Sequence, residues 1–181
     1  DTVEDTLTSL AASLNGSDLE IHAQWMELLG REAISRRFFI TLQRLVGRIG
    51  DEATGNASPS VRREIALLYL SRLLFLCFLE ARGWLDSDQR FLARTFDDCM
   101  AKGGRYQRRV LEPLFFGTLN TPPRSRAPLA RSLGRIPFLN GGLFSRSPAE
   151  RANRGLVMRD NEFGEAFDQL LVRYRFTPRE E

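Results

Sequence analysis

The stretch from Val61 to Arg82, VRREIALLYLSRLLFLCFLEAR, decides the fold of this chain of 181 residues. Between Leu73 and Leu79, apolar side chains occupy nearly every side of a helix drawn at about 3.6 residues per turn. A helix that is hydrophobic all round is a buried one. The sequence therefore predicts a long central helix that forms the core of the fold.

Both ends of this helix are signalled by local residue types. Ser58 can act as the N-cap, and Pro59 suits the first helical position, where its missing N–H has no partner to lose. Gly83 can adopt the left-handed conformation that commonly ends a helix. Trp84 is then placed to pack back on Leu79. The central helix is accordingly predicted to begin at Pro59 and to end just before Gly83.

The hydrophobic segments and the two cysteines indicate the cellular compartment of the protein. The run Ile65–Leu79 is too short to span a bilayer and is interrupted by Arg72. The acidic start, residues 1–5, lacks the apolar run of a signal peptide. Cys77 and Cys99 each lie in an apolar helical pattern, as buried free thiols of a reducing compartment do. We therefore expect a cytoplasmic protein with no membrane span.

Apolar residues recur at helical spacing on both sides of the central helix. Further helices are predicted over residues 3–14, 21–29, 34–49, 88–101, 106–115 and 163–174. Asp86 or Ser87 can cap the helix at 88–101, and Pro113 is expected to kink the one that follows. No segment alternates with period two for long. The predicted fold is all-α, with at most a short hairpin near residues 136–144.

The domain organisation is read from one polar stretch. Residues 51–60, DEATGNASPS, are small, polar and rich in turn formers. They predict a flexible linker between an N-terminal helical arm (1–50) and a helical core domain (61–181). A chain of this size, with 43% hydrophobic residues, can bury a core without disulfides or metal. Residues 121–135 are expected to be loop-like, with at most two helical turns around Leu129.

The sequence lacks the residues of a complete catalytic or metal site. His22 is the only histidine, and a lone histidine on a helix is usually a packing or surface residue. Two cysteines far apart and one histidine do not make a four-ligand zinc site. Asp97 and Asp98 are adjacent, so they diverge by about 100° on a helix and do not converge on one metal ion. We expect no catalytic residue and no metal in this chain.

Two signatures of DNA-modifying enzymes are also incomplete. The PD-(D/E)xK nuclease motif needs an acidic residue two positions before a lysine, but the only lysine, Lys102, follows Met100 at that distance. The stretch Thr121–Arg124 has the two prolines of a base-stacking methyltransferase loop. Such a loop needs a polar residue directly before the prolines and an aromatic residue after them that stacks on the flipped base. Here Thr121 precedes the prolines and Arg124, which is not aromatic, follows them. Neither stretch is interpreted as catalytic.

Arginine supplies nearly all of the positive charge. The net charge is +3 and the isoelectric point is about 9.3. Guanidinium groups bind phosphate in a bidentate fork, and such contacts position a protein on DNA without reading its sequence. The candidate nucleic-acid-binding residues are Arg105, Arg108, Arg109, Arg124, Arg126, Arg131 and Arg135. The alternative is a solvated arginine-rich surface without a ligand.

Four blocks of the sequence resemble a known family. They are RLLFLCFLEARGWLD (72–86), RYQRRVLEPLFFGTLNTPP (105–123), RIPFLNGGLF (135–144) and FDQLLVRYRFTPREE (167–181). In order and spacing they are similar to blocks of large fused restriction–modification proteins, which include type IIG restriction enzymes and phage-defence adenine-specific DNA methyltransferases. The resemblance covers residues 33–181, and the N-terminal 32 residues have no match in it.

The resemblance implies a role for this region within a larger protein. In the family it is a helical connector between an N-terminal part, often a nuclease, and a methyltransferase that uses S-adenosylmethionine to methylate adenine in DNA. The family's catalytic motifs lie outside these residues, so no cofactor is expected in this chain. The implied partners are DNA, through the parent protein, and the methyltransferase domain. Family-motif residues without an implied role are Pro137, Asn140, Gly141, Gly142 and Phe144.

A second hypothesis is a helical protein–protein interaction module with no nucleic-acid role. In that case the apolar segment around residues 136–144 would be a docking surface. Exposure of Phe138 and Phe144 would favour it, whereas their burial would make the segment structural. A stand-alone enzyme is a third and weaker hypothesis because no catalytic group has its partners.

Overall fold

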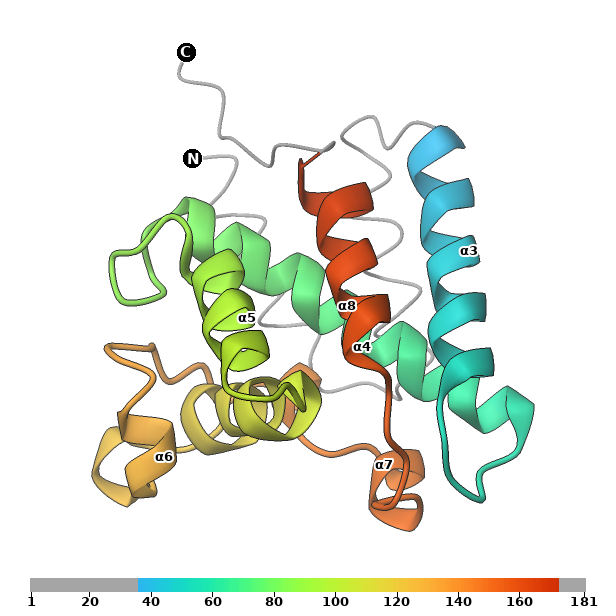
Figure 1. Cartoon of the computed structure of the whole chain (residues 1–181). Coiled ribbons are helices and arrows are strands. Elements are labelled where there is room, and N and C mark those ends of the chain that lie inside the picture. Colours follow the sequence, from blue (N-terminus) through green and yellow to red (C-terminus); the bar gives the residue numbers. More distant parts are fainter. Residues whose placement is uncertain (1–35, 173–181) are drawn as a thin grey trace.

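A computed structural model describes residues 36–172, and Figure 1 shows the central helix α4 with the other helices arranged around it. α4 runs from Pro59 to Ala81, and Ser58 accepts a hydrogen bond from the backbone N–H of Val61 at 3.4 Å. Gly83 has a φ of +70°, and the N–H of the next residue donates to the carbonyl of Leu79 at 2.9 Å. This is the Schellman ending, so both predicted ends of the helix are confirmed.

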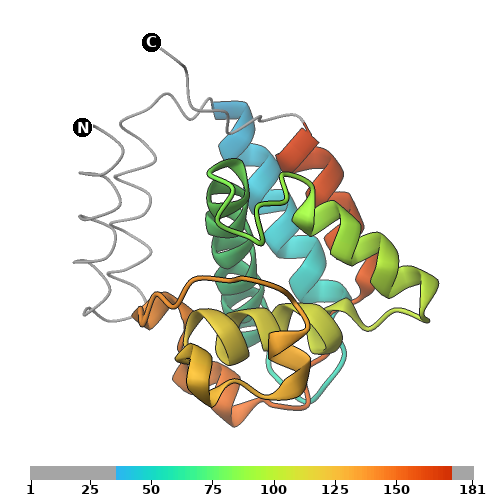
Figure 2. The same cartoon turned by 90° about the vertical axis from the view of Figure 1, so that its left-hand side faces the viewer.

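Two helices lie side by side against α4 (Figures 1 and 2). They are α3 (Arg36–Glu52) and α8 (Asp160–Ala166), and a π-helical segment, η5 (Phe167–Val172), continues α8. α3 buries Leu45 and Ile49 completely, while Arg48 on its polar side pairs with Glu162 of α8 at 3.2 Å. Gly50 lets α3 approach α4 closely, because a Cβ there would lie 2.8 Å from the side chain of Arg63.

The predicted linker at residues 51–60 is packed in the structure. Ala53 and Ala57 are buried, and the N–H of Thr54 donates to the carbonyl of Val157 at 2.9 Å. The guanidinium of Arg62 also reaches back to the carbonyls of residues 53, 55 and 57. α3 and α4 therefore share one core. The arm predicted over residues 1–50 stays a prediction for residues 1–35, which lie outside the described part.

Helix α5 (Phe91–Ala101) begins three residues later than predicted. Asp86 and Ser87, the predicted caps, adopt left-handed φ angles of 55° and 58° instead. Asp88 accepts from the N–H of Arg90 at 2.8 Å, and Glu80 of α4 accepts from the N–H of Leu92 at 2.6 Å. The first turn of α5 is thus satisfied by a carboxylate from another helix, which local sequence does not reveal.

The segment predicted as a kinked α-helix is π-helical. It comprises η1 (Gln107–Leu111) and η2 (Pro113–Leu119). Pro113 has no N–H, and its ring collides with the carbonyl four residues back in a regular α-helix. The wider π-helical path, with bonds from residue i to i−5, avoids that collision. The regular helix is therefore disturbed at Pro113, as expected, but by widening of the helix and not by a simple kink.

The remaining elements gather with η1 and η2 at the lower end of the molecule (Figures 1 and 2). They are η3 (Pro123–Ser125), α6 (Pro128–Arg131), η4 (Gly142–Phe144) and α7 (Pro148–Ala152). α6 is the short helix expected around Leu129. The possible hairpin near residues 136–144 does not form, because the N–H groups of Leu139 and Asn140 both donate to the carbonyl of Leu119.

The described residues therefore form an all-α fold, as predicted, with an aromatic core. Tyr69 of α4 lies edge-on to Phe115 of η2, and Phe144 of η4 lies edge-on to Phe75. Cys77 and Cys99 are free and buried, in agreement with the sequence. Within residues 36–172, no helix is long and apolar enough to cross a membrane.

Candidate nucleic-acid interface

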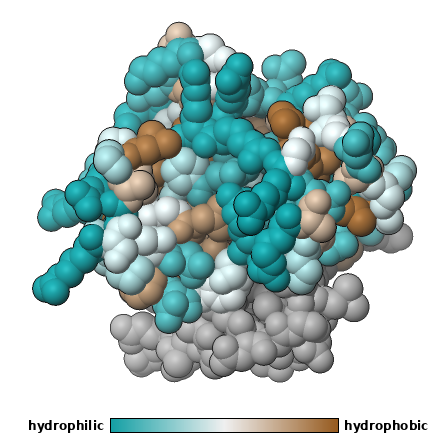
Figure 3. Space-filling view, turned by 90° about the horizontal axis from the view of Figure 1, so that it is seen from below, coloured by the Kyte–Doolittle hydropathy of each residue, from teal (hydrophilic) through white to brown (hydrophobic). Residues whose placement is uncertain are grey.

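The seven arginines predicted to bind nucleic acid fall into two groups by their surroundings. Arg105, Arg124, Arg131 and Arg135 are exposed, and their guanidinium groups bind no other residue in the described part of the chain. Arg124 and Arg131 lie on η3 and α6 at the lower end of the molecule. Figure 3 views that end, where hydrophilic side chains predominate and hydrophobic ones are scattered.

The other three predicted arginines are engaged within the fold. Arg126 is only 7% exposed, and burial lowers the pKa of its guanidinium. That guanidinium donates to the carbonyls of Thr118, Thr121 and Pro137 at 3.1–3.3 Å, so it holds the loop that follows η2 in place.

Arg109 and Arg108 form their contacts nearer the surface of the molecule. Arg109 donates to the carbonyl of Lys102 at 2.7 Å, and Arg108 pairs with Glu112 at 2.8 Å. Both keep part of their surface toward solvent, whereas Arg126 does not.

The family-motif segment has a largely structural setting. Asn140 has a φ of 48°, a left-handed conformation that asparagine tolerates better than most residues. Pro137 contributes its carbonyl to Arg126, Gly141 is buried, and Gly142 begins the 3₁₀ turn η4. Phe144 is 1% exposed, whereas Phe138 is 39% exposed. The exposure expected of a docking surface is therefore found at one of the two phenylalanines.

Arg72 holds this segment from inside the molecule. Its side chain is completely buried and forms a bidentate ion pair with Glu150, at 2.6 and 2.9 Å. It also donates to the carbonyls of Leu143 and Ser145 at 2.7 and 2.8 Å. The guanidinium carbon lies 5.2 Å from the centre of the Phe115 ring. In the sequence, Arg72 stands out only as an interruption in an apolar run. A charge in a buried run implies a buried partner, but not which one.

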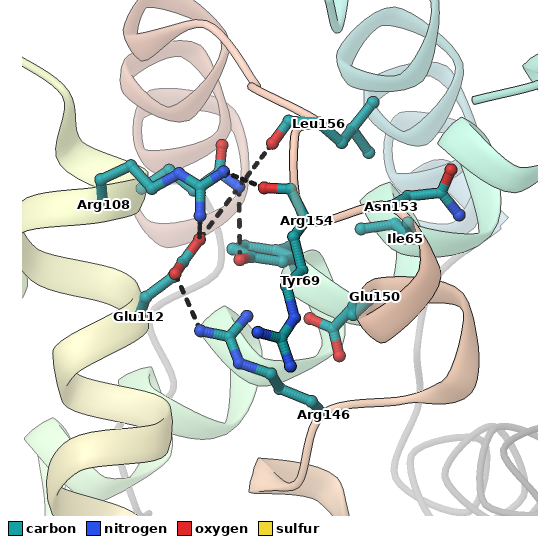
Figure 4. A pocket seen from close by; sticks show the side chains of 10 residues that line it. Ile65, Tyr69, Arg108, Glu112, Arg146, Glu150, Asn153, Arg154 and Leu156 are labelled. Atoms are coloured by element: carbon teal, nitrogen blue, oxygen red, sulfur yellow. Dashed lines mark hydrogen bonds and ion pairs between the residues drawn. The ribbon is translucent and has the colours of Figure 1, made fainter. Parts of the chain in front are cut away.

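A small recess opens between η1, α4 and the ends of α7 (Figure 4). Its free volume is about 10 Å³. Lining residues include Tyr69, Gln107, Arg108, Glu112, Arg146 and Arg154. Glu112 accepts from both Arg108 and Arg146, at 2.8 and 2.9 Å. Arg146 also stacks 4.0 Å above the centre of the Phe116 ring.

Only Arg108 of this recess was among the predicted residues. Arg146 and Arg154 flank α7 and come to Arg108 through the fold, a juxtaposition without a local sequence signal.

The residues dismissed as catalytic or metal ligands have ordinary surroundings where they are described. Asp97 and Asp98 are exposed on α5, and Asp98 lies 3.9 Å from Arg94. Within residues 36–172, no group of three or more histidine, cysteine or acidic residues is placed to hold a metal ion. His22 lies outside the described residues.

Comparison with known proteins places these features in a context. Residues 65–144 match the family described as MmeI, helicase spacer domain. The chain is 36% identical over 131 residues to a protein of Methanocaldococcus jannaschii described as a type II restriction enzyme and methyltransferase. That alignment covers 70% of this chain and 11% of the relative, so the chain spans about a ninth of the relative's length. No solved structure matches the chain significantly. The resemblance to a region of fused restriction–modification enzymes is thereby confirmed.

Proposed function

We propose that this chain is a non-catalytic connector that lines the DNA path of a restriction–modification enzyme. The match to a spacer domain supports the connector role. The exposed arginines of η3, α6 and the loop after α6 support the contact with DNA, because unpaired guanidinium groups are suited to phosphate. The observation that carries the proposal is the set Arg124, Arg131 and Arg135, charged and without an internal partner among the described residues.

The methylation chemistry is proposed to reside elsewhere in such a protein. The relative described as a restriction enzyme and methyltransferase is far longer than the matched region. We therefore expect the parent to methylate adenine with S-adenosylmethionine through residues outside this chain. Isothermal titration of the 181-residue chain with S-adenosylmethionine should give no binding heat, and a saturable signal would contradict this assignment.

The DNA contact is tested by measuring affinity for a fluorescent duplex as salt is varied. Binding through phosphates weakens with salt by roughly one log unit per log unit of salt for each phosphate engaged. Replacing Arg124, Arg131 and Arg135 with glutamine should weaken binding on any duplex sequence. The salt slope should also fall by roughly one for each phosphate that is no longer bound.

A control with the same net charge uses Arg44, Arg63 and Arg159 replaced by glutamine. Arg44 and Arg63 lie on α3 and the start of α4, on the opposite side of the molecule from α6 (Figure 1). Equal weakening in both triple variants would reduce the effect to net charge and contradict a defined DNA-binding face. Absence of binding by the unaltered chain at low salt would contradict the DNA contact altogether.

The interaction-module hypothesis is favoured by one observation, the 39% exposure of Phe138. If that residue docks a protein partner, Phe138→Ser should weaken association with the rest of the parent protein while leaving DNA affinity unchanged. The reverse result would remove the support for this hypothesis.

A further inference from the structure

The recess beneath η1 brings together three arginines from separate parts of the chain. Arg108 comes from η1, Arg146 from the segment before α7, and Arg154 from the segment after it. Figure 4 shows the guanidinium groups of Arg146 and Arg154 directed at the same opening. Like charges repel, so such a convergence requires compensation by carboxylates or by a bound anion.

The carboxylates of the recess compensate only part of this charge. Glu112 is shared between Arg108 and Arg146. Glu150 is already the bidentate partner of the buried Arg72 and also accepts from the N–H of Ser147. The guanidinium of Arg154 has no partner among the described residues. The recess therefore carries an excess of positive charge at its mouth.

A neutral hydrogen-bond donor lies at the back of the recess. Tyr69 is 2% exposed, and its hydroxyl oxygen accepts from the amide of Gln107 at 3.4 Å. The orientation of that amide is fixed, because its oxygen accepts from the N–H of Met158 at 2.8 Å. Burial and the nearby Glu112 raise the pKa of Tyr69, which keeps the phenol protonated. Its O–H has no acceptor within residues 36–172.

We infer that this recess binds one phosphate of the DNA backbone. A free volume of about 10 Å³ admits a single atom of oxygen size, as a bound water would need. One phosphate oxygen would enter and accept from Tyr69, while the other oxygens stay at the mouth between Arg146 and Arg154. The inference rests on the proposed function. It adds one specific phosphate-binding site to the DNA contacts that are proposed for the exposed arginines.

Two variants of the 181-residue chain separate this site from general electrostatics. Arg154→Ala removes a charge, so DNA affinity should fall roughly three- to tenfold and the salt slope by roughly one. Tyr69→Phe keeps the ring and removes only the hydroxyl, so affinity should fall roughly three- to tenfold with the salt slope unchanged. Arg90→Ala removes an exposed charge outside the recess, so it is the matched control for Arg154→Ala and should weaken DNA binding less than Arg154→Ala does. Circular dichroism confirms that each variant folds.

Inorganic phosphate supplies an independent readout. Titration of the chain should shift the side-chain Nε–H resonance of Arg154, and Tyr69→Phe should weaken that shift. If the recess binds phosphate while neither variant changes DNA affinity, the site serves a free anion and the DNA assignment is overturned. If the unaltered chain binds DNA and neither variant affects DNA or phosphate, the inference fails and the proposed function survives. Failure of the proposed function is recognised separately, by an unchanged salt slope in the Arg124, Arg131 and Arg135 variant.

Discussion

The interior around Arg72 and the surface around α6 both depend on arginine, in opposite ways. Arg72 directs its hydrogen bonds to Glu150 and two main-chain carbonyls, and three aromatic rings surround it. Arg131 on α6 is exposed and binds no other described residue. A buried guanidinium whose hydrogen bonds are all formed within the protein stabilises the fold. A guanidinium at the surface without such hydrogen bonds is available to a ligand. Residue type does not distinguish these uses, but the acceptors within reach do.

The largest effect is expected from breaking the interior pair. Arg72→Met should lower the free energy of unfolding by about 3–5 kcal/mol, because Glu150 is left as a buried charge without its partner. Urea unfolding measures this directly. Arg72→Met combined with Glu150→Leu should be less destabilised than Arg72→Met alone, since no buried charge remains. A double variant as unstable as the sum of its parts would contradict this account.

Arg126 tests whether a predicted DNA-binding arginine stabilises the fold or binds DNA. Arg126→Gln should cost about 2 kcal/mol of stability, because a buried charged donor to three carbonyls is removed. Its effect on DNA affinity, measured at a temperature where the variant is folded, should be smaller than that of Arg124→Gln two residues away. The opposite order would return Arg126 to the binding surface.

Interior tyrosines extend the comparison to pH. Tyr106 is completely buried, and its hydroxyl oxygen lies 3.4 Å from the hydroxyl oxygen of Thr95. Burial raises the pKa of Tyr106 above the ordinary value of 10.0. The folded state therefore holds this proton more tightly than the unfolded state. The contribution of this group to the free energy of unfolding is fully present below pH 10. Above pH 10 it falls by about 1.4 kcal/mol per pH unit. Tyr106→Phe should make the alkaline decline of the unfolding free energy shallower, and an unchanged slope would contradict the assignment.

The smallest effect on stability is expected at the surface. Arg131→Gln should change the free energy of unfolding by less than about 0.5 kcal/mol, because its guanidinium has no partner among the described residues. In the same variant the salt slope of DNA binding should fall by roughly one. A loss of stability near that of Arg126→Gln would show that α6 depends on Arg131 structurally.

The parts of the fold predicted from sequence are those governed by neighbours along the chain. The limits of α4 follow from Ser58 and Gly83, and its burial follows from an apolar run with no polar side. The start of α5 was misplaced because its cap comes from Glu80 on another helix. The π-helical form of residues 107–119 depends on how the chain relieves the strain at Pro113, which composition does not specify.

The candidate site was predicted less fully than the fold, because it depends more on contacts between residues far apart in the sequence. Arg124 and Arg126 are indistinguishable in sequence, yet one is exposed and the other is enclosed by three carbonyls. Arg146 and Arg154 join Arg108 only once α7 is packed beside η1. Contacts between residues dozens of positions apart determine which charges are free, and such contacts leave no trace in a local pattern.

The hold on the segment between Pro137 and Ser145 has an evolutionary consequence. Arg72 and Arg126 grip this segment through main-chain oxygens, which every amino acid carries. These hydrogen bonds therefore do not depend on which side chain stands at an exposed position of the segment. Substitutions could accumulate at an exposed position such as Phe138 without moving the chain. Selection that retains a particular side chain at such a position must therefore act through a binding partner that contacts this side chain.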